Sequence, residues 1–478
     1  MTAHVFLMAT AGITLQQGVD LAYLLASIGF ILGLKQLSSP RSARKGNSTA
    51  AVGMAIALIA SLFVLHPTNT KIVIVVVAVA IGGVVGLVSA RKVKMTAIPQ
   101  MVAAFNGVGG GAAALVSIDE YMHVSLAAPG IVSIVAVIFS VVVGSVSFAG
   151  SIIAFLKLQE MMSGVPITYP GQRIVNGGLV VVILGLVVYL IGVHASVAAL
   201  AIMLVVSILL GLGFVLPIGG ADMPVVISML NAFTGVAVAA SGFAIGNTGL
   251  IVGGTLVGAS GTLLTKMMSD SMGRSLTNVL FAAVGKPVAS EGGGAGDAGE
   301  VKSYRSGNPE DIGVLLAYSQ KVIIVPGYGL AVAQAQHVAK ELATTLEARG
   351  VEVTYAIHPV AGRMPGHMNV LLAEADVPYD QLKEMDLVND DFQSTDVVLV
   401  VGANDVVNPA AREVKDSPIY GMPILNADQA KNIVFLKRSM RPGFAGIDNP
   451  LMYDPKTIML FGDAKDSLTK LVAAVKGA

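Results

Sequence analysis

The clearest chemical pattern in the chain is a pair of glycines that follows a short apolar run. The run Lys321–Val325 is followed by Pro326 and then by Gly327-Tyr328-Gly329-Leu330-Ala331-Val332. A Gly-x-Gly turn between a strand and a helix lets backbone N–H groups approach a pyrophosphate at the helix N-terminus. The apolar run and a helix predicted from about Ala331 to Ala348 supply the context that a lone Gly-x-Gly lacks. The pattern predicts a dinucleotide site, with a tight ligand-free turn as the alternative.

A second feature concerns which dinucleotide would fit. An NAD site usually has Asp or Glu about 20 residues beyond the glycines, where the carboxylate binds the ribose 2′-OH. This chain instead has Ile357-His358-Pro359-Val360 at that place. The missing acid favours NADP, whose 2′-phosphate needs cations, and Lys437-Arg438-Ser439-Met440-Arg441 offers three cations and a hydroxyl. A solvated basic turn is the alternative for this segment.

Apolar runs of strand length alternate with helical segments in the C-terminal part of the chain. This rhythm predicts a Rossmann-like α/β domain with a parallel sheet. A Gly-rich acidic stretch at 291–297 precedes it and predicts a flexible linker. We assign 271–307 to the linker and 308–478 to the α/β domain. The predicted strands are Lys321–Val325, Val351–Ile357, Asp396–Val401, Pro423–Asn426, Asn432–Leu436 and Thr457–Phe461.

The first 270 residues have the composition of a membrane domain. They contain 17 charged side chains, against 43 in the remaining 208 residues. Runs of 48 and 43 uncharged residues flank Asp222, and each is long enough for two crossings of about 20 residues. The sequence predicts a multi-span α-helical membrane domain at 1–270 with about nine helices, near 18–35, 50–66, 71–90, 99–118, 126–157, 174–193, 195–217, 223–244 and 246–266.

Basic residues predict the orientation of these helices, because cytoplasmic loops retain Lys and Arg. With the N-terminus outside, eleven of the twelve basic residues up to Arg274 fall in inside loops, and only Lys71 falls outside. An odd number of helices then places the C-terminal domain in the cytoplasm. The first 17 residues contain no basic segment of the kind that starts a cleaved signal peptide, so we expect the first helix to be retained.

Composition also excludes several classes of protein. The chain has no Cys, so it has no disulfide framework, no Cys-ligated metal and no thiol nucleophile. Its 30 basic and 30 acidic side chains give zero net charge, which gives no reason to expect a nucleic-acid partner. No pair of His residues has the spacing of metal ligands, so we predict no metal site.

Taken together, five segments resemble a known family, the proton-translocating NAD(P) transhydrogenases. The resemblance covers nearly the whole chain, since the β subunit of that family joins a nine-span membrane part to an NADP(H)-binding domain. The segments that carry the resemblance are 327–336, 358–375, 402–405, 437–440 and 461–465. Such a series of motifs in this order is highly specific.

The resemblance implies an activity and partners. Transhydrogenase moves a hydride between NAD(H), held by a partner α subunit, and NADP(H), held by the β subunit, and couples the transfer to proton passage through the membrane. The resemblance therefore implies an α subunit partner, a dimer of αβ units, contact with lipid and a place in the bacterial inner membrane. The alternative is a membrane transporter or channel gated by a cytoplasmic NADP(H)-sensing domain.

The resemblance also implies a cofactor site without a catalytic residue, because the hydride passes directly between the two cofactors. Asp405 is expected near the nicotinamide, and Lys437, Arg438 and Ser439 at the 2′-phosphate. The other residues expected at the site are Gly327, Tyr328, Gly329, Leu330, Ala331, Val332, Val360, Ala361, Gly362, Arg363, Met364, Gly402, Ala403, Asn404, Gly462 and Asp463.

Four polar residues are expected on the proton path or in its coupling to the cofactor: Asn106, Asp222, Asn231 and Asp405. Asp222 is the only acid between positions 161 and 269, and charges at the membrane are functional candidates, although a loop Asp can also be merely solvated. Asn231 matches a polar position of the family, with hydrogen bonding between helices as the alternative. Asn106 stands where some family members have His. Since an amide does not titrate, either water ordered by Asn106 carries the proton or a titrating group lies on the partner subunit.

Overall fold

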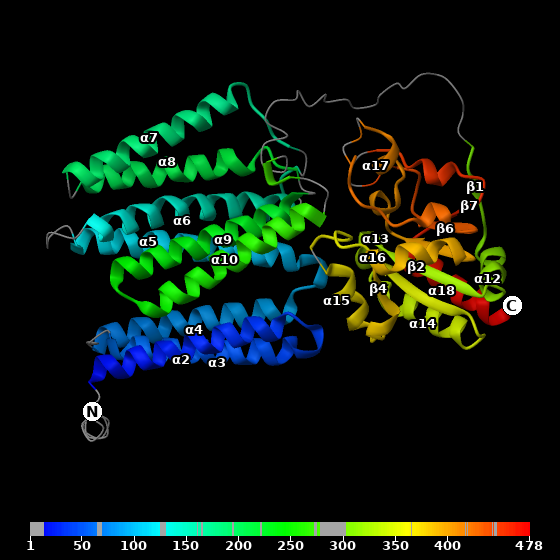
Figure 1. Ribbon diagram of the computed structural model, residues 1–478, viewed down its shortest axis with the longest axis horizontal. Coiled ribbons are helices and arrows are strands. Elements are labelled where there is room, and N and C mark those ends of the chain that lie inside the picture. Colours follow the sequence, from blue (N-terminus) through cyan, green and yellow to red (C-terminus); the bar gives the residue numbers. More distant parts are fainter. Residues whose placement is uncertain are drawn as a thin grey trace. The chain divides into compact units, whose positions relative to one another are not determined.

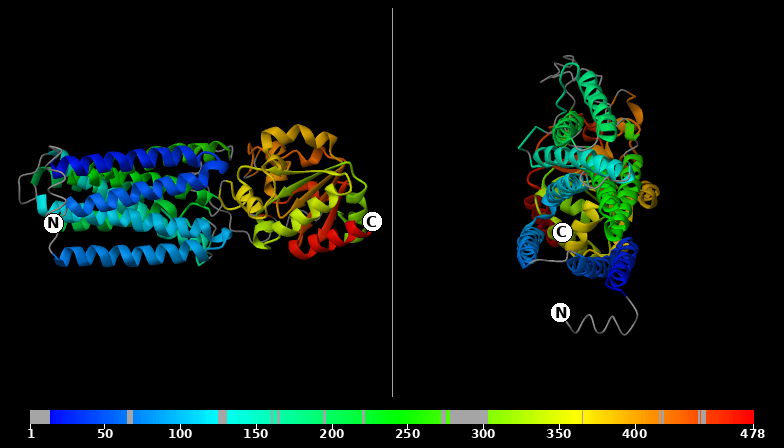
Figure 2. Two further views of the ribbon diagram at one scale, coloured as in Figure 1. Left: turned by 90° about the horizontal axis from the view of Figure 1, so that it is seen from below. Right: turned by 90° about the vertical axis from the view of Figure 1, so that its left-hand side faces the viewer.

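The structure is a computed structural model that describes residues 14–64, 69–124, 131–159, 161–163, 166–193, 196–219, 222–271, 275–277, 303–364, 366–415, 417, 419–441, 443 and 447–478. The chain forms two compact units, one made of long helices and one built around a sheet (Figure 1 and Figure 2). Most of the predicted linker at 271–307 lies outside the described residues, so its boundaries stay predictions.

Within the described part of the chain, nine helices are long and apolar enough to cross a membrane, as predicted. The predicted segment 126–157 is a single helix of 28 residues, α6. The nine helices are α2 (Leu15–Leu37), α3 (Pro40–Val64), α4 (Asn69–Lys92), α5 (Ile98–Val124), α6 (Ile131–Leu158), α7 (Gln172–Val193), α8 (Val197–Val215), α9 (Met223–Ile245) and α10 (Thr248–Ser271).

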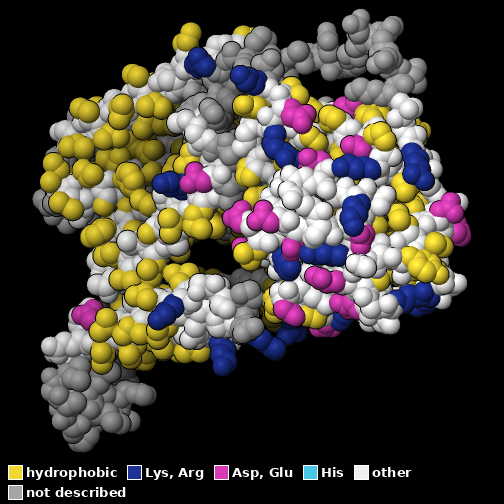
Figure 3. Space-filling model, turned by 45° about the vertical axis from the view of Figure 1, so that its right-hand side comes forward, with side chains coloured by type: hydrophobic (Ala, Val, Ile, Leu, Met, Phe, Trp, Pro, Cys, Tyr) yellow, Lys and Arg dark blue, Asp and Glu magenta, His cyan; other side chains and the backbone are white. Residues whose placement is uncertain are grey.

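Small residues bring these helices into contact, as is usual where lipid removes the hydrophobic drive between helices. A Cβ added at Gly144 of α6 would lie 2.7 Å from the carbonyl oxygen of Gly110 on α5. In the same way, a Cβ added at Gly254 of α10 would lie 2.6 Å from the carbonyl oxygen of Gly235 on α9. The outward side chains are mostly apolar, and the helical unit is largely yellow on the face drawn in Figure 3, whereas the other unit mixes acidic and basic groups.

The second unit contains a parallel sheet of seven described strands in the order β1-β7-β6-β5-β2-β3-β4. Every pairing between these described strands is parallel, which confirms the predicted sheet class. The strands are β1 (Arg305–Ser306), β2 (Lys321–Pro326), β3 (Glu352–Ile357), β4 (Leu382–Glu384), β5 (Val397–Val401), β6 (Asn432–Lys437) and β7 (Thr457–Phe461).

Both faces of the sheet are covered, so its central strands are apolar on both sides. On β2, Val322 and Ile324 face one buried cluster, while Ile323 and Val325 face the other. Long helices cover the first face: α12 (Pro309–Ala317), α14 (Gln336–Glu347), α15 (His367–Glu374) and α18 (Ala464–Gly477). Short pieces, including α16 (Met385–Val388), cover the second face.

Two sequence predictions are wrong in this unit. The segment Pro423–Asn426 is not a strand, because the N–H of Leu425 donates to the carbonyl of Val406, outside the sheet. The helix predicted from Ala331 to Ala348 is two helices, α13 (Tyr328–Val332) and α14. The break falls at Gln334, whose φ of 49° is incompatible with a continuing helix.

Candidate functional site

The loops singled out in the sequence follow β2, β3, β5, β6 and β7, so all of them lie at the carboxyl edge of the sheet. From β2 the chain proceeds to β3 and β4 on one side and then returns to β5 on the other side of β2. The order of strands therefore reverses between β2 and β5. In open α/β sheets, ligands bind in the crevice outside the carboxyl ends of the strands at such a reversal.

The glycine turn after β2 packs against the turn after β5. The N–H of Gly327 donates to the carbonyl of Val401 at 2.9 Å, and the N–H of Gly329 donates to the carbonyl of Gly402 at 3.0 Å. Gly402 has a φ of 66°, and a Cβ there would lie 2.4 Å from the Cα of Gly329. The glycines thus serve first to bring two turns together, and a nucleotide would meet the surface that the turns form.

The side chains of this turn divide into core and surface groups. Leu330 and Ala331 are buried against the sheet, so only their backbone can serve a ligand. Tyr328 lies under the guanidinium of Arg363, whose Cζ is 4.5 Å from the ring centroid. This cation–π contact joins the loop after β2 to the loop after β3. Val332 is exposed.

The loop after β3, Val360–Met364, is shaped by two buried imidazoles. His358 Nε2 lies 2.7 Å from the carbonyl oxygen of Pro423, and His358 Nδ1 accepts the N–H of Val360 at 3.2 Å. His367 Nδ1 accepts the N–H of Arg363 at 3.0 Å. Burial lowers the pKa of His358 to about 4, and burial together with the charge of Arg363 lowers the pKa of His367. Both rings are therefore neutral at pH 7.

The turn after β5 holds the carboxylate expected near the nicotinamide. Asp405 Oδ1 accepts a hydrogen bond from Asn404 Nδ2 at 2.9 Å, and Asn404 Oδ1 lies 3.4 Å from Lys437 Nζ. Lys437 also donates to the carbonyl of Arg441 at 2.9 Å. Burial lowers the pKa of Lys437, and the carboxylates of Asp405 and Asp448 oppose that shift. The structure thus brings Lys437 to Asn404 and Asp405 rather than leaving it extended beside Arg438.

Arg438 and Ser439 are exposed at the end of β6. The N–H of Gly462, after β7, donates to the carbonyl of Lys437 at 3.0 Å, which ties that turn to the same edge. Asp463 is the N-cap of α18, where its Oδ1 accepts the N–H of Lys465 at 2.9 Å. The remaining expected residues of this edge are Ala361 and Ala403, which are buried, and Gly362 and Met364, which are half-buried.

This donor set fits a dinucleotide that carries a 2′-phosphate. A guanidinium and a hydroxyl are exposed after β6, which suits a phosphate dianion. Directly after β3, where an NAD site would have a carboxylate, the chain has the buried ring of His358. The residues present therefore fit NADP(H), and those described directly after β3 and β6 include no carboxylate that would select a free 2′-OH.

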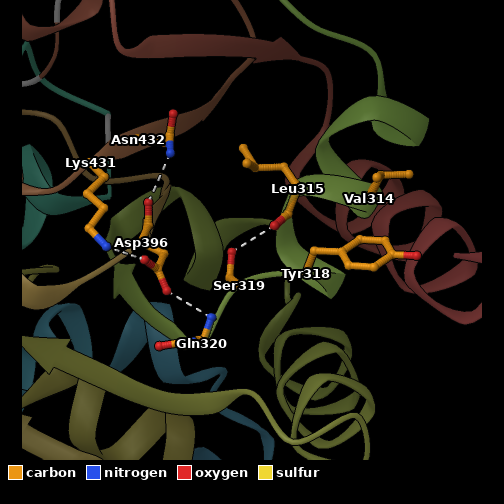
Figure 4. A pocket seen from close by; sticks show the side chains of 8 residues that line it. All are labelled: Val314, Leu315, Tyr318, Ser319, Gln320, Asp396, Lys431 and Asn432. Atoms are coloured by element: carbon orange, nitrogen blue, oxygen red, sulfur yellow. Dashed lines mark hydrogen bonds and ion pairs between the residues drawn. The ribbon is translucent and has the colours of Figure 1, made fainter.

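A pocket of about 580 Å³ lies at the amino edge of the sheet, far along the strands from these loops (Figure 4). Its carboxylate, Asp396, accepts Lys431 Nζ at 2.7 Å and the N–H groups of Gln320 and Lys321 at 2.8 and 3.1 Å. The hydrogen bond from Lys431 contributes most to holding the pKa of Asp396 below its usual range. Because its charged groups already pair with one another, we place the candidate dinucleotide site at the carboxyl edge and not in this pocket.

In the helical unit, Asn106 lies at the centre of a buried polar cluster between α5, α6 and α9. Its Nδ2 donates to Ser151 at 2.9 Å and to Ser147 at 3.3 Å, and its Oδ1 is buried with no hydrogen-bond partner in the described part of the chain. Ser147 in turn lies 2.7 Å from Thr234 Oγ1 and donates to the carbonyl of Leu230. We call Asn106, Ser147, Ser151 and Thr234 the Asn106 cluster.

A second group of hydroxyls joins the same three helices. Ser241 lies 2.8 Å from both Ser140 and Ser117, and Ser140 also donates to the carbonyl of Ala237 at 2.9 Å. Along α5, α6 and α9 this group follows the Asn106 cluster, beyond the contact between Gly110 and Gly144. The sequence analysis missed these hydroxyls, although their spacing is regular. They recur at seven-residue intervals on α6 (Ser140 and Ser147) and on α9 (Thr234 and Ser241).

The other two polar candidates of the membrane part lie on or before α9. Asp222 directly precedes the helix and is partly buried, and Asn231 is half-buried two turns further on. Nothing in the described residues joins Asn231 to Asn106 by a hydrogen bond. The sequence reading also missed Lys157, which is buried at the end of α6 and donates to the carbonyls of Leu216 and Ile218 at 2.6 and 2.7 Å, shortly before Asp222.

The fold defines a protein with multiple membrane-capable helices followed by a Rossmann-like α/β domain. The family model described as NAD(P) transhydrogenase beta subunit matches residues 19–474. Two relatives named NAD(P) transhydrogenase subunit beta, both from Rhodospirillum rubrum, are each 48% identical to this chain over 462 residues, which covers 95% of this chain and 98% of the relative. The chain belongs to the NAD(P) transhydrogenase beta subunit family.

Membership confirms the resemblance drawn from the sequence. It makes the chain part of an oxidoreductase, and with the nine apolar helices it supports a multi-pass membrane protein. The family implies binding of NADP(H), and the designation of a beta subunit implies a partner alpha subunit.

Proposed function

We propose that this chain holds NADP(H), accepts a hydride from NADH held on the partner α subunit, and couples this transfer to proton translocation across the membrane. The observation that carries the proposal is the convergence of five loops at the carboxyl edge of the sheet, around the reversal between β2 and β5. Arg438 and Ser439 are exposed there, and no carboxylate follows β3 directly. Family membership supplies the class of reaction.

In this proposal each loop holds one part of the cofactor. The backbones of 327–332 and 360–364 serve the pyrophosphate and ribose, while Lys437, Arg438 and Ser439 serve the 2′-phosphate. Gly402, Ala403, Asn404 and Asp405 serve the nicotinamide end, and Gly462 and Asp463 close the site on the β7 side. The contact of Tyr328 with Arg363 supports a shared surface for the first two loops.

When bound, NADP(H) supplies the carbon that accepts or gives up the hydride. The residues of this chain need only bind the cofactor, orient it and exclude water, because direct transfer between two nicotinamides requires no protein acid or base. Asp405 is proposed to link the cofactor to proton occupancy. Its place beside Asn404 and near the ammonium of Lys437 supports that role, because a carboxylate in such surroundings responds to added charge.

For the proton path we propose Asn106, Asp222 and Asn231. The Asn106 cluster supports this proposal, since buried hydroxyl and amide groups in a membrane bundle are costly and tend to be functional. The amide of Asn106 does not titrate, so its part is to order the hydroxyls or a water molecule. Asp222 supplies a titrating carboxylate at the start of α9. The bias of basic residues supports an external N-terminus and a cytoplasmic α/β domain. Family membership supports a dimer of αβ units in the bacterial inner membrane.

The test combines the chain with its NAD(H)-binding α partner in liposomes that contain a pH-sensitive dye. We expect hydride transfer from NADH to an NADP⁺ analogue, and movement of protons that depends on the presence of both nucleotides. Proton flux that NADP(H) alone gates, without any hydride transfer, would instead support a channel with a nucleotide-sensing domain.

Asp405→Asn tests the coupling role separately. We expect this variant to lose the pH dependence of NADPH release while it still binds NADPH. If the pH dependence of release is unchanged, Asp405 only shapes the turn after β5.

A further inference from the structure

His367, the first residue of α15, is joined to the backbone of the loop after β3. Its ring is fully buried, and its Nδ1 accepts the N–H of Arg363 at 3.0 Å. A neutral ring whose Nδ1 accepts must carry its proton on Nε2, and this buried Nε2 has no hydrogen-bond partner among the described residues. A buried unpaired donor is unfavourable, so the ring has a cost at Nε2 beside its hydrogen bond at Nδ1.

The loop is also folded closely around the ring. Gly362 has a φ of 103°, and a Cβ at this position would lie 2.4 Å from His367 Nδ1. The next residue, Arg363, places its guanidinium 4.5 Å from the ring centroid of Tyr328 in the turn after β2. A continuous set of contacts therefore runs from His367 through Arg363 to Tyr328, across two of the loops that meet at the sheet edge.

We infer that His367 is a positioning residue for dinucleotide binding, which fixes the backbone of Arg363 so that the guanidinium is held on Tyr328 before NADP(H) arrives. This inference rests on the proposed function, because it assumes that the site binds NADP(H). Affinity improves when a binding loop is already in its bound conformation, since less freedom is lost on association. The imidazole provides what an apolar residue would not, an acceptor for the N–H of Arg363.

The test measures NADPH affinity of the full chain in detergent, by titration of NADPH fluorescence. His367→Leu removes the acceptor of the Arg363 N–H. We expect NADPH to bind about tenfold more weakly, because the loop loses one hydrogen bond that orders it. In His367→Asn the amide Oδ1 can take the place of Nδ1, so affinity should stay within about threefold of the original. Thr354→Val is the control, since Thr354 on β3 is also buried and its hydroxyl has no partner. Its affinity should not change.

A double-variant cycle with Tyr328→Leu separates positioning from general loss of structure. If His367 acts through Arg363 on Tyr328, the two substitutions together should weaken binding no more than the stronger one alone. Thermal unfolding of each variant reports whether it folds. If His367→Leu does not fold, then His367→Asn and its cycle with Tyr328→Leu test whether His367 positions Arg363.

Three results would overturn the inference alone, provided that the original chain binds NADPH. The first is a His367→Leu variant that binds NADPH as tightly as the original chain. The second is a folded His367→Asn variant as weak as His367→Leu, and the third is a cycle in which the two effects simply add. An original chain without saturable NADPH binding would overturn the proposed function itself.

Discussion

At the scale of single residues, the loop after β3 depends on neutral histidines. His358 accepts the N–H of Val360, and its Nε2 is in contact with the carbonyl of Pro423, so the ring joins two loops that are far apart in the sequence. Protonation would place a second N–H where Nδ1 accepts, and a charge where the ring is buried. Either effect favours release of the ring.

We therefore expect the stability of the chain to fall in acid. The pKa of His358 is lowered from 6.5 to about 4 in the folded state, so folding favours the neutral ring. Its contribution is complete above pH 6.5 and is lost as the pH falls toward 4, amounting to about 3 kcal/mol in all. Thermal unfolding in detergent at pH 7.5 and 4.5 measures the loss. His358→Asn should be less stable at pH 7.5 but should lose less stability between the two values. An equal acid sensitivity in this variant would assign the effect to other groups.

Arg438 allows a separate test of cofactor choice. Its guanidinium is exposed at the end of β6, whereas Lys437 is occupied by Asn404 and the carbonyl of Arg441. We expect Arg438→Gln to weaken NADPH binding by about 1.5–3 kcal/mol, the value of a charge-assisted hydrogen bond. NADH, which lacks the 2′-phosphate, should bind as weakly as before. Titrations with both nucleotides check this, and Arg412→Gln, remote in sequence and paired with Asp428, is the control.

The motifs predict a site at these residues but do not show where their side chains turn. The family resemblance assigns Lys437, Arg438 and Ser439 to one phosphate. Adjacent residues at a strand end point to alternate sides, and Lys437 turns toward the β5 loop. The imidazoles of His358 and His367 were missed because a lone His carries no pattern of its own. Their roles depend on backbone groups that only the fold brings near.

At the scale of elements, the two glycine turns form one unit. Gly327, Gly329 and Gly402 contact one another through backbone atoms, so the turn after β2 cannot keep its position without the turn after β5. This contact lies at the reversal of strand order, where the cofactor is proposed to lie across the carboxyl edge of the sheet. The spacing of Gly327 and Gly329 correctly predicted a turn between a strand and a helix. It could not predict the contact with Gly402, which is 73 positions away from Gly329.

Two alanine substitutions separate backbone strain from this contact. Gly350 and Gly402 both have a positive φ, of 85° and 66°, but a Cβ at Gly350 meets nothing within 4 Å. Gly350→Ala should therefore cost only about 1–2 kcal/mol of left-handed strain. Gly402→Ala should cost more than twice as much and should abolish NADPH binding, because its Cβ meets the backbone of Gly329. Chemical unfolding and NADPH titration of both variants measure the difference, and equal losses would contradict the argument.

Strands were predicted correctly where the apolar runs were long. The prediction failed where pairing with a neighbouring strand determines whether a segment is a strand. The five predicted strands now seen as β2, β3, β5, β6 and β7 are buried on both faces along most of their length, so each is mostly apolar. Pro423–Asn426 looks similar in composition, yet the N–H of Leu425 donates to the carbonyl of Val406 outside the sheet. The short edge strands β1 and β4 were missed, because two or three residues carry no period.

At the scale of the whole molecule, most of the buried polar side chains in the described part of the helical unit lie on α5, α6 and α9. They include the Asn106 cluster and the hydroxyls of Ser117, Ser140 and Ser241, and α5 and α6 also make the close glycine contact at Gly110 and Gly144. By contrast, the most apolar window of α4 has no buried residue. Composition predicted the apolar helices but not which of them bury polar side chains, because hydropathy does not show which face of a helix is buried.

The proposed coupling predicts that the Asn106 cluster matters for proton movement and not for cofactor binding. Ser147 is in contact with Asn106, Thr234 and the carbonyl of Leu230. Ser147→Ala should slow coupled hydride transfer and proton uptake in liposomes by about tenfold, the effect of about one lost hydrogen bond on a rate-limiting step. NADPH affinity should be unchanged. Ser207→Ala on α8 is the matched control, because Ser207 is equally buried and its hydroxyl has no partner. A similar slowing in both variants would show that the bundle responds to any buried change, and that the cluster is structural.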